Sequence, residues 1–342
     1  MNDLIAQRKQ QHLDILANDP QVERHASGFE RIRLTHRALP DLNLDDIDTR
    51  CEFLGKTLSF PLIISSMTGG GDEQQHLINQ RLAQAAEFCG VGMAVGSQRI
   101  MFGHKKAQQS FELRPHAPET VLLANLGAVQ LNKGFTLEHC QSAVDILEAD
   151  GLYLHLNPLQ EAIQPEGDTD FKHLHHLISA TCKNLSVPVL LKEVGCGLSP
   201  ADIALGKQAG VHYFDVAGRG GTSWSRIEHH RRANPDDTLG LLFQDWGLTT
   251  VEALTLAQQT HPDITLIASG GIRNGIDIAK AVILGAQVCG MAAPLLKPAQ
   301  QSTQAVIHAI DTLQRQYQTA LFLLGCQNHQ DIHNNRTLLL TP

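Results

Sequence analysis

The chain has 342 residues, a formal net charge of −8 and 42% hydrophobic residues. This acidic balance argues against nucleic-acid binding, which needs a basic face, but a small anionic ligand needs only a few local cations. Apolar runs long enough to span a membrane are missing, and the N-terminus has no secretory signal. The seven cysteines are scattered without a C-x-x-C pair, which is typical of a protein from the reducing cytoplasm.

Short apolar runs alternate with helical segments along most of the chain. Residues 1–57 are expected to form an N-terminal extension of helix and loop that contributes to the substrate site. Strands buried on both faces are predicted at 59–66, 91–97, 120–126, 152–157, 187–194, 211–217, 264–269 and 287–292. Helices are predicted at 74–89, 136–149, 170–184, 199–209, 248–260, 275–285 and 300–324. Eight such units favour an α/β fold with a (β/α)8 TIM barrel over 58–342, and a doubly wound open sheet is the alternative.

Small residues follow the first, seventh and eighth predicted strands. Residues 65–71 read SSMTGGG, residues 269–275 read SGGIRNG and residues 290–294 read GMAAP. Glycines let a ligand approach the backbone closely. The first run alone is as well explained by a flexible turn. The last two loops favour a phosphate-bearing cofactor, because loops 7 and 8 with a helix N-terminus form the usual phosphate site of these barrels.

Polar side chains follow the second, third and fourth predicted strands. They are Arg99, Asn125, His155, Asn157, Gln160 and Glu161. The planar guanidinium of Arg99 could hold a phosphate, and Asn125 could contact a ring amide. Each of these two residues could also be an ordinary surface or turn residue. Because Mg²⁺ prefers one or two carboxylates together with ligand phosphates, Glu161 is the candidate metal ligand.

The fifth and sixth strands end in residues that suit a flavin or a cation. Lys192 lies inside an apolar strand, so it must be paired or functional. It could stabilise negative charge on a reduced flavin, or form an ion pair with Glu193 or a neighbour. Thr222 lies in a glycine-rich loop that suits a phosphate or ribityl group. Trp224 could stabilise a cation with its π-face or simply pack in the core, and Glu228 follows it.

In this order, the motifs resemble the type 2 isopentenyl-diphosphate isomerases over nearly the whole chain. The resemblance rests on R-K-x-x-H at 8–12, FLGK at 53–56, PLIISSMTGG at 61–70, GVGMAVGSQR at 90–99, NLGAVQ at 125–130, LHLNPLQEAIQPEGDTDF at 154–171, KEVGCGLS at 192–199, GGTSW at 220–224, DWG at 245–247 and SGGIRNGIDIAKA at 269–281. Position 217 departs from it, because Ala217 stands where many members carry serine.

The resemblance implies a cytoplasmic enzyme of isoprenoid biosynthesis that interconverts isopentenyl and dimethylallyl diphosphate by a 1,3-allylic proton shift. It implies FMN in the reduced state, NADPH to reduce it, Mg²⁺, and a homotetramer or homooctamer. By resemblance, FMN would contact Ser66, Met67, Thr68, Ser97, Asn125, Lys192, Thr222, Gly270, Gly271, Ile272, Ala292 and Ala293.

The remaining site residues are implied in the same way. The substrate diphosphate would contact Arg8, Lys9, Ser97, Gln98, Arg99, His155, Asn157 and Gln160, and Glu161 would hold Mg²⁺. Beside the flavin, the candidates for assisting proton transfer or stabilising the cation are Gln160, Trp224, Glu228 and His155.

Three other functions remain open from the sequence. An FMN-dependent 2-hydroxy acid oxidase or dehydrogenase needs a base histidine in an S-N-H-G-G-R context, and the corresponding loop here reads AGRGGTSW. A purine-nucleotide dehydrogenase needs a nucleophilic cysteine after the sixth strand, whereas Cys196 lies one strand too early. A non-catalytic flavin-binding protein is the third, and retention of every diphosphate and Mg²⁺ candidate argues against it.

Overall fold

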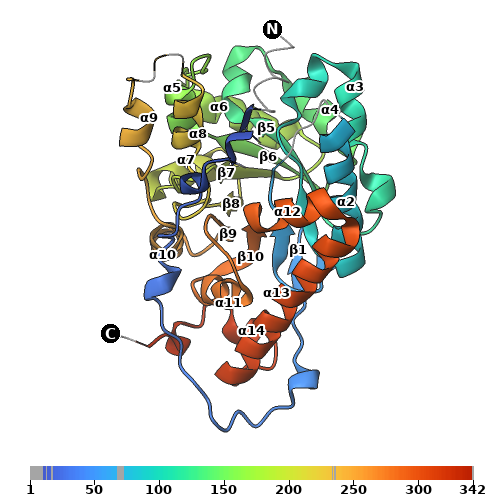
Figure 1. Ribbon diagram of the computed structural model, residues 1–342, viewed down its shortest axis with the longest axis vertical. Coiled ribbons are helices and arrows are strands. Elements are labelled where there is room, and N and C mark those ends of the chain that lie inside the picture. Colours follow the sequence, from blue (N-terminus) through green and yellow to red (C-terminus); the bar gives the residue numbers. More distant parts are fainter. Residues whose placement is uncertain are drawn as a thin grey trace.

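Eight parallel strands close into a barrel (Figure 1). The computed structural model describes residues 11–12, 14–16, 18–67, 73–232, 234 and 236–340. The barrel strands pair in chain order, and the last closes on the first: β3 (Leu62–Ile64), β4 (Gly92–Ala94), β5 (Leu122–Gly127), β6 (Gly151–Leu156), β7 (Val189–Glu193), β8 (Tyr213–Asp215), β9 (Thr265–Ser269) and β10 (Ala286–Met291). The (β/α)8 barrel prediction is confirmed, and the open-sheet alternative is wrong.

Helices surround the barrel and connect its strands. The α-helices are α2 (Glu73–Cys89), α3 (Lys105–Gln108), α4 (Leu137–Leu147), α5 (Pro158–Ile163), α6 (Leu174–Asn184), α7 (Pro200–Gln208), α8 (Trp224–His230), α9 (Leu239–Leu242), α10 (Thr250–Thr260), α11 (Gly275–Ile283), α12 (Ala293–Gln301), α13 (Thr303–Leu324) and α14 (His329–Ile332). The long helix α13 packs against both α2 and α11 (Figure 1). Among the described helices, none is both long and apolar enough to cross a membrane.

The structure differs from the prediction at both ends of the chain. The helix predicted over 300–324 is divided between α12 and α13, because extended Ser302 separates them and its side chain caps α13 by accepting from the Ala305 N–H. Near the other end, β1 (Cys51–Phe53) and β2 (Lys56–Leu58) form an antiparallel hairpin where helix and loop were expected. The predicted division between residues 57 and 58 therefore passes through β2.

Alternate residues of the barrel strands face opposite sides of the sheet. Leu62 and Ile64 belong to the large core between strands and helices, whereas Ile63 belongs to a second cluster. The other barrel members of this second cluster come from six further strands or their starts: Ala94, Val121, Leu123, Tyr153, Leu190, Ile267 and Val288. Because the side-chain period of a strand is two, this cluster fills the barrel interior. Cys51, Phe53 and Leu58 of the hairpin join it, so the hairpin packs against the interior.

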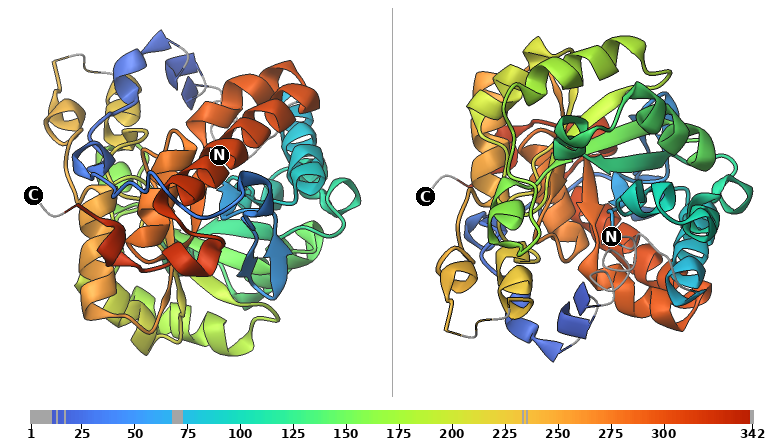
Figure 2. Two further views of the ribbon diagram at one scale, coloured as in Figure 1. Left: turned by 90° about the horizontal axis from the view of Figure 1, so that it is seen from below. Right: turned by 90° about the horizontal axis from the view of Figure 1, so that it is seen from above.

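The described part of the N-terminal extension is fastened to the loop that follows β8. Both views of Figure 2 show the blue N-terminal segment beside the yellow part of the chain. Glu23 and Thr222 form an isolated antiparallel bridge. The buried Arg24 side chain donates to the carbonyl oxygens of Gly195, Gly221, Thr222 and Gln244 at 2.8 to 3.1 Å. Four backbone acceptors for one guanidinium compensate the cost of burying its charge.

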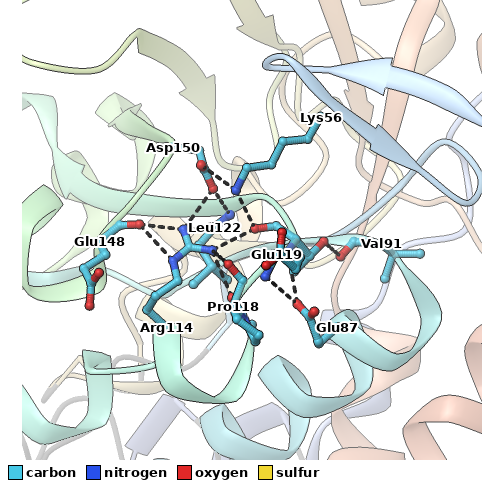
Figure 3. A network of polar contacts seen from close by, with 11 residues as sticks. Lys56, Glu87, Val91, Arg114, Pro118, Glu119, Leu122, Glu148 and Asp150 are labelled. Carbon is cyan, nitrogen blue, oxygen red and sulfur yellow. Dashed lines mark hydrogen bonds and ion pairs between the residues drawn. The ribbon is translucent and has the colours of Figure 1, made fainter.

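A polar network joins the amino-terminal ends of neighbouring barrel strands (Figure 3). Asp150, directly before β6, pairs with Lys56 at 2.7 Å and with Arg114 at 3.0 Å. It also accepts from the Leu122 N–H at the start of β5, at 2.8 Å. Arg114 in turn donates to the Thr120 carbonyl at 2.9 Å. Because catalytic groups of these barrels lie at the opposite end, we interpret this network as structural.

We expect Asp150→Asn to destabilise the fold while leaving ligand binding at the other end of the barrel unchanged. The substitution weakens two ion pairs that are partly buried, for a loss of about 2 kcal/mol in the free energy of unfolding. Urea unfolding measures this loss in the free energy of unfolding. Asp48→Asn is the matched control, because the Asp48–Arg50 pair is exposed and should contribute much less. Equal stability of the two variants would contradict a structural role for the network.

Candidate functional site

A cavity of about 280 Å³ lies at the carboxyl end of the barrel. Residues at or just after the carboxyl ends of all eight barrel strands line it, together with His12, Leu16 and Glu23 of the N-terminal extension. The cavity-lining residues that the sequence also predicts as site residues are Ser66, Met67, Ser97, Arg99, Asn125, His155, Asn157, Gln160, Glu161, Lys192, Thr222, Trp224, Gly270, Gly271, Ile272, Ala292 and Ala293. Closure of the barrel brings these distant segments together.

Five predicted site residues are not in this set, and one of them is Glu228, which is fully buried and does not line the cavity. Thr68, Arg8 and Lys9 lie outside the described residues. Gln98 is fully buried and does not line the cavity. Its amide accepts from the Asn125 N–H and donates to the Ala143 carbonyl, both at 2.9 Å, so it holds β5 against α4.

The loops after β8, β9 and β10 form a cradle of bare backbone. Gly270 and Gly271 adopt φ of +98° and +78°. An added Cβ at Gly270 would lie 2.0 Å from the Gly218 carbonyl oxygen, and one at Gly271 would lie 2.5 Å from that of Gly220. Only glycine fits such a close approach. Ala292 is the N-cap residue of α12 and lines the cavity, and its side chain does not cap the helix. The positive end of the α12 helix dipole therefore lies at the cavity without a capping side chain. The cradle suits a phosphate group.

A hydrogen-bonded row crosses the wall formed by β3, β5 and β6. The Asn125 amide nitrogen donates to Ser66 Oγ at 2.8 Å and to the Val95 carbonyl at 3.0 Å. Its Oδ1 contacts His155 Nδ1 at 2.8 Å. Because Oδ1 can only accept, Nδ1 carries the proton in this arrangement. The predicted Asn125 and His155 are therefore joined, and His155 has a fixed ring orientation.

Lys192 is paired and also lines the cavity. Its Nζ contacts Asp215 Oδ2 at 2.9 Å and donates to Ser269 Oγ at 3.0 Å. The Tyr153 hydroxyl also donates to Asp215 Oδ2, at 3.2 Å. The pair expected with Glu193 or a neighbour is therefore formed with Asp215, across the β7–β8 ladder. Asp215 had no signal in the sequence, because a lone Asp in an apolar strand does not reveal its partner.

Glu193 is held by the backbone that follows it. Its Oε2 accepts from the N–H groups of Val194, Gly195 and Cys196. Burial raises its pKa to about 7, against the opposing effect of these three hydrogen bonds. Glu193 therefore fixes the loop after β7, in which Val194 and Gly195 line the cavity.

A second polar row joins α5 to α8. Asn157 Nδ2 donates to Gln160 Oε1 at 3.2 Å and to Glu161 Oε1 at 2.8 Å. Gln160 Nε2 donates to Glu228 Oε1 at 2.9 Å. Glu228 is fully buried and does not line the cavity, so it reaches the cavity only through its contacts.

His12 completes this row from the N-terminal extension. Its Nε2 lies 3.0 Å from Glu228 Oε1, and its ring packs edge-on against Trp224 at a centroid distance of 5.2 Å. Burial alone would raise the pKa of Glu228, but the hydrogen bonds from His12 and Gln160 and the charge of Arg231 lower it. The Glu228 carboxyl group is therefore ionised. His12 belongs to the segment at 8–12 that the sequence singled out, but it was not predicted as a site residue.

Acidic groups in the described part of the chain do not form a ready-made metal site. No cluster of three or more His, Cys, Asp or Glu residues suited to a metal ion occurs among the described residues. Glu161 accepts from Asn157 and from the Asp168 N–H at 2.7 Å, and it lines the cavity. A cation at Glu161 would therefore need ligand oxygens and water to complete its coordination, as Mg²⁺ sites with bound phosphates do.

We expect Lys192→Met to destabilise the fold by leaving Asp215 buried without its cation. Breaking a buried ion pair costs about 3 kcal/mol at about pH 7. Urea unfolding measures this loss. Lys207→Met is the control, since its partner Asp263 is exposed. A loss for Lys192→Met that is no larger than the loss for Lys207→Met would contradict the reasoning.

The chain is similar in sequence to one protein family and to enzymes of known name. Residues 5–110 and 155–339 match the family of FMN-dependent dehydrogenases. The isopentenyl-diphosphate delta-isomerase of Paracoccus zeaxanthinifaciens is 59% identical over 98% of this chain and 97% of its own length. The enzyme of the same name from Hydrogenovibrio crunogenus is 56% identical, over 98% of both.

Solved structures with the same fold are more distant. A flavocytochrome b2 variant with sulfite bound has a TM-score of 0.68 at 18% identity, covering 93% of this chain and 78% of that one. An oxidized active mutant of (S)-mandelate dehydrogenase has a TM-score of 0.67 at 14% identity, covering 98% of both. These likenesses establish the fold alone. Family and full-length relatives together confirm the resemblance found in the sequence: the chain belongs to the FMN-dependent dehydrogenase family and to the isopentenyl-diphosphate delta-isomerases.

Proposed function

We propose that the protein interconverts isopentenyl diphosphate and dimethylallyl diphosphate by a 1,3-allylic proton shift, with reduced FMN, in isoprenoid biosynthesis. The observation that carries this proposal is the composition of the cavity. It combines a phosphate cradle at Gly270 and Gly271 with a separate wall that holds Arg99, His155 and Asn157. One phosphate-bearing cofactor and one diphosphate substrate need two such anion sites in a single cavity.

The cavity residues suit FMN. The backbone cradle at Gly270 and Gly271 and the N-terminus of α12 would hold its phosphate. Ser66 and Asn125 offer hydrogen-bonding groups to the ring, and Lys192 would favour negative charge on it. The remaining proposed contacts are Met67, Thr68, Ser97, Thr222, Ile272, Ala292 and Ala293. When bound, reduced FMN would supply electron density that stabilises positive charge and a group that can carry a proton.

The diphosphate does not react, and its binding holds the alkene in place. Arg99, His155 and Asn157 line one wall, and Ser97 lies beside Arg99. Arg8 and Lys9 would add positive charge from the N-terminal extension. Gln98 would act indirectly, because its amide fixes the backbone of Asn125. Glu161 would hold Mg²⁺, whose charge would offset the negative charge of the diphosphate.

The proton shift adds a proton at the terminal alkene carbon and removes one from the carbon beside the CH₂O group. Alkenes are weak bases, so the positive charge that develops must be stabilised. Trp224 lines the cavity, and the π-face of an indole ring suits a cation. Gln160 also lines it, and its amide is oriented by Asn157 and Glu228. The ionised Glu228, fully buried behind Gln160, pairs with Arg231 at 2.5 Å and fixes the orientation of the Gln160 amide. His155 is a further candidate for moving the proton.

We also propose NADPH as the reductant that primes the flavin, and a homotetramer or homooctamer located in the cytoplasm. The isomerisation changes no net oxidation state, so the reductant is needed only for priming.

The activity itself is testable directly. Under anaerobic conditions with FMN, NADPH and Mg²⁺, the protein should convert isopentenyl diphosphate to dimethylallyl diphosphate. Product formation can be followed by chromatographic separation of the two isomeric diphosphates. Omission of NADPH should abolish turnover unless the flavin is reduced chemically. Absence of product with fully reduced flavin would refute the proposed function, and turnover of lactate or glycolate would favour a 2-hydroxy acid enzyme.

We expect Glu228→Gln to lower kcat by about 100-fold with little change in KM. A rate loss of this size is typical when one group that assists proton transfer is removed. The amide keeps the volume but removes the buried negative charge behind Gln160. Flavin absorbance serves as the control for folding and cofactor retention. If KM rose instead, with kcat unchanged, Glu228 would act in substrate binding and not in the proton shift.

A further inference from the structure

Asp168 lies behind the cavity wall, between α5 and α6. Its carboxylate is 3.3 Å from Arg99 Nη1 and 3.5 Å from Lys133 Nζ, and it accepts from Gln130 Nε2 at 3.2 Å. The Asp168 backbone N–H donates to Glu161 Oε2 at 2.7 Å. Arg99, Gln130 and Glu161 line the cavity, whereas Asp168 does not. One residue therefore contacts, from behind, the arginine and the carboxylate that face the ligand.

We propose that Asp168 is a positioning residue, which holds the Arg99 guanidinium in the orientation that receives the substrate diphosphate. This inference rests on the proposed function. The Arg99 backbone is fixed at the start of the 3-10 helix η4 (Gln98–Phe102), but its side chain has several rotatable bonds. Asp168 occupies Nη1 and leaves Nη2 and Nε for a phosphate group. An arginine that is oriented before binding loses less conformational freedom for each hydrogen bond it forms.

The loop geometry separates the two contacts of Asp168. An added Cβ at Gly167 would lie only 1.8 Å from the Glu161 carbonyl oxygen, so this glycine lets the loop fold back onto α5. That close approach brings the Asp168 N–H to Glu161. The side chain of Asp168 holds Arg99, and the backbone N–H of Asp168 holds Glu161. A side-chain substitution at Asp168 therefore changes the contact with Arg99 and keeps the contact with Glu161.

Positioning and simple charge predict opposite results. If only Coulomb attraction mattered, removal of a carboxylate next to an anion site would strengthen anion binding. If Asp168 orients Arg99, the same removal weakens it. The sign of the effect of Asp168→Asn on diphosphate binding therefore discriminates between the two.

The experiment measures the Kd of inorganic pyrophosphate by titration calorimetry, on FMN-loaded protein with Mg²⁺. We expect Asp168→Asn to weaken binding about 10-fold, as loss of a supporting contact does in comparable sites. In an Arg99→Ala background the same substitution should change Kd by less than about twofold, because its effect passes through Arg99. Asp263→Asn is the matched control: it changes the net charge equally at a distant exposed position. Flavin absorbance reports that each variant keeps its cofactor.

The outcomes separate the alternatives. Binding by Asp168→Asn that is unchanged or tighter overturns the proposal, as does an equal loss in the Arg99→Ala background. Omission of Mg²⁺ should weaken pyrophosphate binding by the same factor in Asp168→Asn as in the wild type. If omission of Mg²⁺ no longer weakened binding by Asp168→Asn, Asp168 would be a metal ligand and not a positioning residue. A wild-type protein that binds no pyrophosphate would overturn the diphosphate site of the proposed function itself.

Discussion

The buried carboxylate of Asp215 joins four consecutive barrel strands. It pairs with Lys192 of β7 and accepts hydrogen bonds from Tyr153 of β6 and Ser269 of β9. A backbone contact comes from the Ala217 N–H, just after Asp215's own strand β8. An ionised group without exposure must be compensated in this way, or it would destabilise the fold. The compensation fixes Lys192 at the cavity, so one interaction stabilises the barrel and sets the charge of the site.

The N-terminal extension depends on the same end of the barrel. Arg24 is buried against carbonyl groups of the loops after β7 and β8, and Glu23 pairs with Thr222 and Arg273. These contacts hold the described part of the extension over the cavity, where His12 can contact Glu228. The described part of the extension therefore contributes His12, Leu16 and Glu23 to the lining of the cavity.

The sequence predicted the barrel and most of its rim because both follow simple patterns. Apolar runs of strand length revealed all eight strands, and polar residues directly after them revealed residues such as Arg99 and His155. Partners that act at a distance were not predictable. Glu23 pairs with Arg273 across 250 positions, and Asp168 reaches Arg99 from a loop 69 positions away. Periodicity reports which face a residue occupies, but it does not report which residue of another element lies opposite.

The buried partner of His155 distinguishes this site from one built for hydride removal from a 2-hydroxy acid. A histidine that acts as a strong base gains a proton, and a neighbouring carboxylate would stabilise the resulting charge. Here Nδ1 faces the neutral amide oxygen of Asn125, which stabilises an imidazolium much less than a carboxylate would. The loop after β8 reads AGRGGTSW and supplies no histidine. The shared barrel therefore carries a wall suited to holding a diphosphate, and the fold alone does not determine the reaction.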